Sequence, residues 1–122
     1  PSTALQAGMS IGVLLICVDN LGIPDDIRLE VAKRLEKMTG LKPERLAITA
    51  THTHTAPKVA GACDTIFSSP LSAAEQAHVD QYTRDLTNWI EQAALAALVR
   101  QPFDLAFLDL RLGQQSYWLL VF

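Results

Sequence analysis

The chain has 122 residues, of which 49% are hydrophobic and 19% are charged, and its formal net charge at pH 7 is −3. This composition is typical of a globular protein and argues against intrinsic disorder. The length fits a single domain, residues 1–122, and suffices to bury a hydrophobic core. The acidic balance excludes the basic surface that nucleic-acid-binding proteins use. No apolar run approaches the roughly 20 residues that a membrane-spanning helix needs.

Two strands are expected near the start of the chain. A short one is predicted at residues 3–6, and the continuous apolar run 11–18 predicts a second. The second run does not alternate between apolar and polar residues, which is typical of a strand covered on both faces. It ends at Asp19 and Asn20, where a loop begins.

An amphipathic helix is predicted to follow this loop. Pro24 suits the first helical position, and Asp25 and Asp26 place negative charge at the positive end of the helix dipole. Gly40 stands where a glycine commonly ends a helix. The expected apolar face consists of Ile27, Val31, Leu35 and Met38.

A strand at residues 46–50 completes a β-α-β unit, which predicts two parallel strands. Residues 51–71 show no regular pattern, and loops of this length in small domains are usually functional. Ser72 and Glu75 then have the spacing of a capping box, which predicts a long helix that ends before Pro102. Its expected apolar face contains Val79, Tyr82, Leu86, Trp89, Ile90, Ala93 and Ala97.

Two apolar segments end the chain, a strand at 103–110 and a run at 117–122, with a turn at 113–115 between them. The predicted fold class is therefore α/β, a βαβαβ layer with a mainly parallel sheet and two long helices. An apolar run without a following turn or charge leaves a strand edge that favours self-association. We accordingly expect the chain to be a fragment of a larger α/β catalytic domain. The alternative is a terminal strand paired in the interior of the sheet.

Chemistry is concentrated in residues 50–57 (ATHTHTAP), directly after the predicted strand 46–50. In an extended backbone, His52 and His54 project from the same side, with Cβ atoms roughly 6–7 Å apart. Such a pair can share one metal ion, or one histidine can bind the metal while the other contacts substrate. The simpler interpretation is two polar residues that cap a strand.

Asp19 ends the first buried strand, as His52 follows the second. Ligands in open parallel sheets bind beyond the carboxyl ends of the strands, so these side chains are expected at one edge. Imidazoles suit zinc, and a carboxylate such as Asp19 can bind it or hold a ligand histidine in place by a hydrogen bond to its other ring nitrogen. Equally, Asp19 could cap the loop before the helix.

Residues 18–24 (VDNLGIP) and 46–57 (LAITATHTHTAP), with the helix between them, resemble the N-terminal part of the neutral/alkaline (non-lysosomal) ceramidases. The family pattern is close to A-T-H-T-H-[ST]-[GA]-P, and the resemblance extends over roughly residues 11–100. The sequence differs at Thr55, where serine is usual, and at Lys58, where glycine often follows the proline.

The resemblance implies a zinc-dependent amidase that cleaves the N-acyl bond of ceramide or a related lipid amide. It assigns His52 as a zinc ligand and His54 as a catalytic, substrate-binding residue. Another histidine, a glutamate, a tyrosine and the active-site serine come from later in such chains, so we expect this chain alone to be inactive. The family suggests a secreted, periplasmic or membrane-associated enzyme, although no signal peptide is recognisable here.

Other candidates are weaker. His78 is expected on a helix surface, and Asp64 in the long loop is a faint metal candidate. Cys17 and Cys63 are compatible with a disulfide without implying one. Two further functions stay open: a non-catalytic interaction domain that uses the terminal strand and the long loop, and a different metallo-hydrolase that shares only the H-x-H motif.

Overall fold

The computed structural model describes residues 12–66, 69–99, 106–112 and 115–121. Four strands and two long helices form the described part: β1 (Leu14–Val18), α2 (Asp25–Thr39), β2 (Leu46–Ala50), α3 (Ala73–Val99), β3 (Ala106–Leu112) and β4 (Gln115–Val121). Short 3₁₀ turns at Pro43–Arg45 and Asp64–Ile66 interrupt the connections. The strand predicted at 3–6, and the starts of the strands predicted at 11 and 103, lie outside the described residues.

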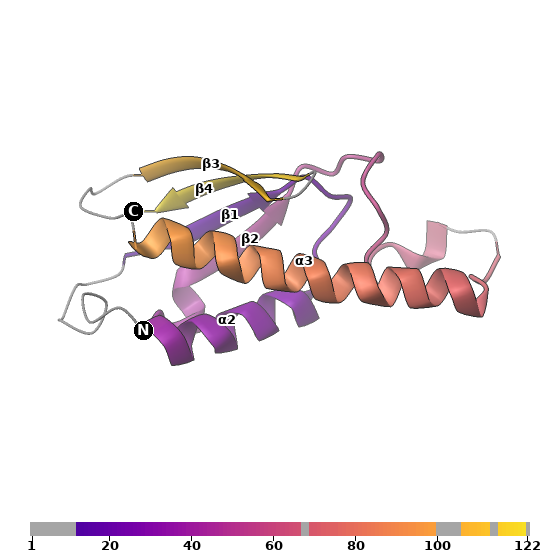
Figure 1. Cartoon of the computed structure of the whole chain (residues 1–122), viewed down its shortest axis with the longest axis horizontal. Coiled ribbons are helices and arrows are strands. Elements are labelled where there is room, and N and C mark those ends of the chain that lie inside the picture. Colours follow the sequence, from indigo (N-terminus) through magenta and orange to yellow (C-terminus); the bar gives the residue numbers. More distant parts are fainter. Residues whose placement is uncertain (1–11, 67–68, 100–105, 113–114, 122) are drawn as a thin grey trace.

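The four strands form one open sheet in the order β2-β1-β4-β3. β1 and β2 are parallel neighbours, with Leu14 opposite Leu46 and Val18 opposite Ala50. The β-α-β unit is thereby confirmed, and with α3 it makes a small α/β structure. The two parallel strands end at the same edge, from which the histidine loop emerges (Figure 1).

The prediction of a mainly parallel sheet is wrong for the C-terminal strands, because β4 runs antiparallel to both β1 and β3. Only two residues separate β3 from β4, and a connection that short allows only an antiparallel return. β4 has a neighbour on each side, so the alternative of a terminal strand paired inside the sheet is the one that the protein adopts. Self-association stays a prediction, and among the described strands the free edges belong to β2 and β3.

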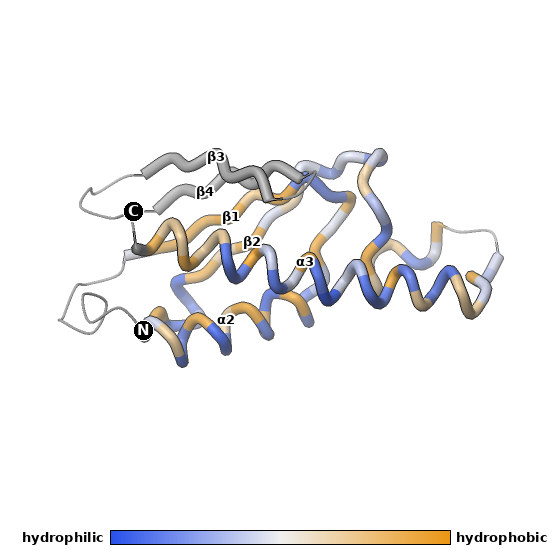
Figure 2. Tube along the Cα trace, viewed as in Figure 1, coloured by the Kyte–Doolittle hydropathy of each residue, from blue (hydrophilic) through white to orange (hydrophobic). Residues whose placement is uncertain are grey.

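Both helices lie side by side on one face of the sheet (Figure 1). Leu14, Ile16 and Val18 of β1 are fully buried in the core that the helices share, whereas Leu15 and Cys17 are only half-buried. Within the described ranges the helices therefore cover one face of β1, not the two expected. Figure 2 shows β1 as a hydrophobic segment and hydrophilic residues along the outer side of α2.

α2 ends where predicted and begins one residue later than predicted. Pro24 precedes the first helical residue, and Gly40 terminates the helix in the left-handed region at φ 78°, donating its N–H to the Glu36 carbonyl. The predicted apolar face is correct except at Met38, which is 45% exposed. Steps of four residues lead from Leu35 to position 39 instead, where Thr39 is buried and donates its hydroxyl to the Leu35 carbonyl.

The capping box of α3 is confirmed by reciprocal bonds. The Ser72 amide donates to the Glu75 carboxylate at 2.8 Å, and the Glu75 amide donates to the Ser72 hydroxyl at 3.3 Å. Arg34 of α2 joins the helices through an ion pair with Glu91 of α3 at 2.9 Å, and it also pairs with Glu30, one turn earlier in α2. The buried face of α3 consists of Leu86, Thr87, Ile90, Ala93, Ala94, Ala97 and Leu98. Neither α2 nor α3 is both long and apolar enough to cross a membrane, which holds for every helix described.

Candidate functional site

The site begins where β1 and β2 end together. The Val18 carbonyl accepts two amide hydrogens, from Asn20 at 2.9 Å and from Thr51 at 3.0 Å. One backbone oxygen therefore fixes the first residues of both loops. This confirms the expectation that the loop after β1 and the histidine loop start as neighbours at one sheet edge.

His52 and His54 do come together, although not along an extended backbone. β2 ends at Ala50, and His52 has φ 63°, in the left-handed region. The assumption of an extended chain is therefore wrong, because the loop turns at His52. The two rings still lie edge to face, with centroids 5.0 Å apart and planes at 86°. A left-handed non-glycine residue costs about 1–2 kcal/mol, which surrounding contacts must offset.

One of those contacts holds the His52 ring. Its Nδ1 lies 2.7 Å from the carbonyl oxygen of Leu21, in the loop after β1. A carbonyl can only accept a hydrogen bond, so this contact requires the proton on Nδ1. In the neutral ring, Nε2 then carries the lone pair. This is the arrangement in which a histidine binds a metal through Nε2 while a backbone carbonyl holds its other nitrogen.

His54 is exposed and lines a pocket of about 290 Å³. Most of the wall is apolar, and the polar groups in it are few, which is the usual composition of a small-molecule site. The lining residues are Asn20, Leu21, His54, Ala56, Pro57, Lys58, Val59, Ala62 and Ile66. The hydroxyls of Thr53 and Thr55, one on each side of His54 in the sequence, are 2.9 Å apart and stiffen the turn.

Asn20 is the polar residue that sequence reasoning missed. It is fully buried, and its side-chain amide donates to the Pro57 carbonyl at 3.2 Å and lies 3.5 Å from the Tyr82 hydroxyl. Its side-chain oxygen is 3.5 Å from the Gly22 amide. An Asn two residues after a buried strand was the available signal, but its partners lie 37 and 62 residues away.

The far side of the histidine loop is fixed by Lys58 and α3. The Lys58 ammonium group contacts the Asp64 carboxylate and the Ala62 carbonyl, the latter at 3.1 Å. The Ala60 amide donates to the Thr83 hydroxyl of α3 at 2.9 Å. Asp64, the faint metal candidate, is therefore engaged in an ion pair that closes the loop.

Asp19 is half-buried at the end of β1. Burial, and then the nearby Asp19 charge, raise the pKa of the Cys17 thiol. Within the part of the chain that the structure describes, the Asp19 carboxylate makes no hydrogen bond to His52 or His54, so its role in orienting a ligand histidine stays a prediction. Cys17 and Cys63 are both free thiols.

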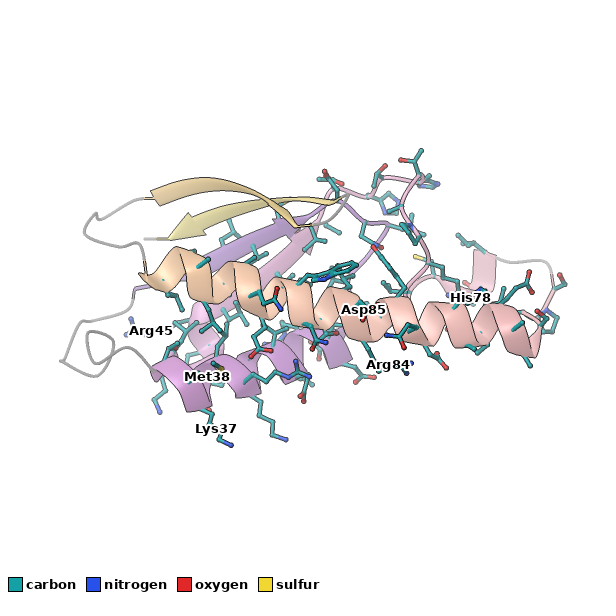
Figure 3. All side chains as sticks on the ribbon, viewed as in Figure 1. Lys37, Met38, Arg45, His78, Arg84 and Asp85 are labelled. Carbon is teal, nitrogen blue, oxygen red and sulfur yellow. The ribbon has the colours of Figure 1, made fainter. Side chains whose placement is uncertain are left out.

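The described residues contain no group of three or more His, Cys, Asp or Glu side chains arranged to hold a metal. A catalytic zinc site usually takes three protein ligands, so the histidine pair is at most part of one. His78 is exposed on α3 as predicted, outside the histidine loop (Figure 3).

Searches against protein-family models, curated proteins and solved structures each returned no match. The resemblance to the ceramidases therefore rests on the motif residues themselves, and the chemistry of the site on its geometry.

Proposed function

We propose that this chain supplies part of the active site of a zinc-dependent amidohydrolase of the neutral ceramidase type. In this proposal the β-α-β unit belongs to a larger α/β catalytic domain. The substrate is ceramide or a related lipid amide, and the reaction is hydrolysis of its N-acyl bond.

The observation that carries the proposal is the 2.7 Å contact between His52 Nδ1 and the Leu21 carbonyl oxygen. Because Nδ1 faces the Leu21 carbonyl, the lone pair on Nε2 of this exposed imidazole points away from that carbonyl. An exposed histidine that only caps a strand has no need for a fixed tautomer. A metal ligand does, because the ion binds the unprotonated nitrogen.

Each histidine then has a separate task. His52 holds the zinc, which when bound supplies a Lewis acid that polarises the amide carbonyl. His54 faces the neighbouring pocket, where it is placed to donate a hydrogen bond to the substrate amide or to move a proton at it. The apolar pocket wall suits a lipid chain next to that polar group.

The remaining ligands, and the active-site serine, lie in this proposal outside the described residues. With fewer ligands than the usual three, zinc affinity of the chain alone is expected to be weak and amidase activity absent. The full activity therefore belongs to a longer parent protein.

Zinc binding to the chain tests the metal role directly. Calorimetric titration with Zn²⁺ should give a binding signal for the wild type that His52→Ala abolishes. His78→Ala is the matched control, because it removes the same ring from an exposed position on α3. Equal zinc binding by His52→Ala and His78→Ala would refute the role of His52.

Activity of the longer parent protein tests the reaction. His52→Ala in that protein should remove both zinc and hydrolysis of a fluorogenic ceramide analogue. Zinc binding without amide hydrolysis would favour the other metallo-hydrolase that shares only the H-x-H motif. The interaction-domain alternative relied on an exposed terminal strand and on the long loop. Because β4 lies between β1 and β3, the long loop is the remaining support for that alternative.

A further inference from the structure

We infer that Asn20 is the positioning residue of the histidine loop: its buried amide sets the Leu21 carbonyl against His52 and so holds the ring in the Nδ1–H tautomer. The idea that this tautomer leaves Nε2 free to bind a metal rests on the proposed function. The tautomer itself exists without metal, so the two ideas can fail separately.

The contacts of residues 18–22 surround the histidine loop on both sides. Before the histidines, the Val18 carbonyl accepts the Thr51 amide at 3.0 Å. After them, the Asn20 side chain donates to the Pro57 carbonyl at 3.2 Å. The Leu21 carbonyl meets His52 between these two attachments. The strand end at Val18 is secured by the sheet, whereas the attachment at Pro57 depends on Asn20.

An amide is well suited to this position. It offers donors for the Pro57 carbonyl and the Tyr82 hydroxyl, and an acceptor facing the Gly22 amide. A hydrocarbon of the same size would leave the Pro57 carbonyl without that donor. A carboxylate would set negative charge against a carbonyl oxygen in a fully buried place.

Asn20 differs in this respect from the other buried polar side chains. Thr39 and Thr87 are nearly as buried, but each donates its hydroxyl to a carbonyl one turn earlier in its own helix. Only Asn20, among the buried polar side chains that the structure describes, joins a strand end, the histidine loop and α3. Its loss should change the loop and not merely weaken a helix.

The test measures the tautomer of His52 in the full metal-free chain. Long-range ¹H–¹⁵N NMR spectra distinguish a protonated from an unprotonated ring nitrogen, and His54 and His78 serve as internal references. At a pH where the ring is neutral, the wild type should show His52 protonated at Nδ1. Asn20→Ala and Asn20→Asp should each shift the ring toward the Nε2–H form. The ratio of Nδ1–H to Nε2–H should fall roughly two- to tenfold, the change that the free energy of one hydrogen bond corresponds to.

Thr87→Val is the control for a general loss of stability, because it removes a buried hydroxyl that does not touch the histidine loop. It should leave the His52 tautomer unchanged. An equal shift in Thr87→Val, or no shift in either Asn20 variant, would overturn the inference. So would a wild type in which His52 carries its proton on Nε2, a result that requires no variant to fold.

The zinc titration separates this inference from the proposed function. An Nδ1–H tautomer that depends on Asn20, in a chain where His52→Ala does not alter zinc binding, leaves the positioning role standing and removes the metal role. The opposite result is zinc binding that His52→Ala removes, together with an Asn20 variant that changes neither zinc binding nor the His52 tautomer. That result supports the metal role of His52 and removes the positioning role of Asn20.

Discussion

The imidazole rings of His52 and His54 meet edge to face with centroids 5.0 Å apart. Two imidazoles on one tetrahedral zinc, with Zn–N distances of 2.0–2.1 Å, would also have centroids about 5 Å apart. The separation therefore fits a shared ion as well as the division in which His52 binds metal and His54 faces the pocket. Substitution of each histidine distinguishes the two arrangements.

We expect His54→Ala to leave zinc affinity within about threefold of the wild type, while His52→Ala lowers it at least tenfold. The reason is that His52 has the fixed tautomer and His54 lines the pocket. Calorimetry on the chain gives the affinities, and the longer parent protein should show a raised KM or lowered kcat for His54→Ala with zinc retained. Equal losses of zinc in both variants would establish a shared ion instead.

Thr83 is expected to anchor the histidine loop to α3. Its hydroxyl accepts the Ala60 amide at 2.9 Å and donates to the Val79 carbonyl at 2.7 Å. Thr83→Val keeps the volume but leaves the Ala60 N–H without an acceptor, at a cost of about 1–3 kcal/mol in unfolding free energy. Hydrogen exchange of the Ala60 amide should accelerate.

The control for this prediction is Thr87→Val. The Thr87 hydroxyl donates only to the Thr83 carbonyl within the same helix, so the Ala60 amide keeps its acceptor. Faster exchange at Ala60 in both variants alike would mean that α3 as a whole, and not the Thr83 hydroxyl, protects the loop.

Alanine substitutions at Gly40 and Gly22 are expected to have opposite effects on the stability of the fold. Gly40 ends α2 at φ 78°, where a side chain costs about 1–2 kcal/mol, so Gly40→Ala should lower the urea midpoint. Gly22 has no positive φ, and an added Cβ there would meet nothing within 4 Å. Gly22→Ala should therefore be neutral or stabilise the fold by about 0.4–1 kcal/mol. The reverse order of midpoints would contradict this account of the helix end.

The stabilisation that the capping box gives to α3 should depend on pH. Bonds from the Ser72 hydroxyl and then the Ser72 amide lower the pKa of Glu75 below its ordinary value of 4.5. A carboxyl whose pKa is lowered in the folded state stabilises it above the unfolded pKa, and that stabilisation is lost as pH falls through the folded pKa. The stabilisation is thus fully present at neutral pH and is lost as the pH falls through the lowered pKa of Glu75.

NMR titration of the Glu75 carboxyl checks this. In the wild type the midpoint should lie below that of Ser72→Ala, because the variant lacks the hydroxyl donor. Identical midpoints would show that the Ser72 hydroxyl does not hold the carboxylate in solution.

Local signals sufficed for the helices and the first two strands. Pro24 and Gly40 mark the ends of α2, and Ser72 with Glu75 begins α3, because caps act within a few residues of the backbone groups that they satisfy. The apolar period likewise predicted Ile27, Val31 and Leu35 as buried residues of α2, although it did not include Ala32. The parallel pairing of β1 and β2 followed from the helix between them.

The order of the sheet could not be predicted in the same way. β4 pairs with β1 across about a hundred residues of chain, and no local pattern states which strand a hairpin will join. The sequence indicated an apolar terminal run, but it did not decide whether this strand lies at an edge of the sheet or in its interior. Packing against α3 and pairing on two sides decided for the interior.

For the site, the sequence by itself determined that two histidines follow the end of a parallel strand. The order of residues places them after the strand, and the helix between the two strands makes those strands parallel. Only the tertiary structure decided how they are held. The Leu21 carbonyl against the His52 Nδ1 and the buried Asn20 amide on Pro57 join segments distant in sequence, and the first of these contacts holds the ring at the left-handed turn. A hydrogen bond depends on where two atoms meet in space, and that position emerges only once the strands and helices have packed.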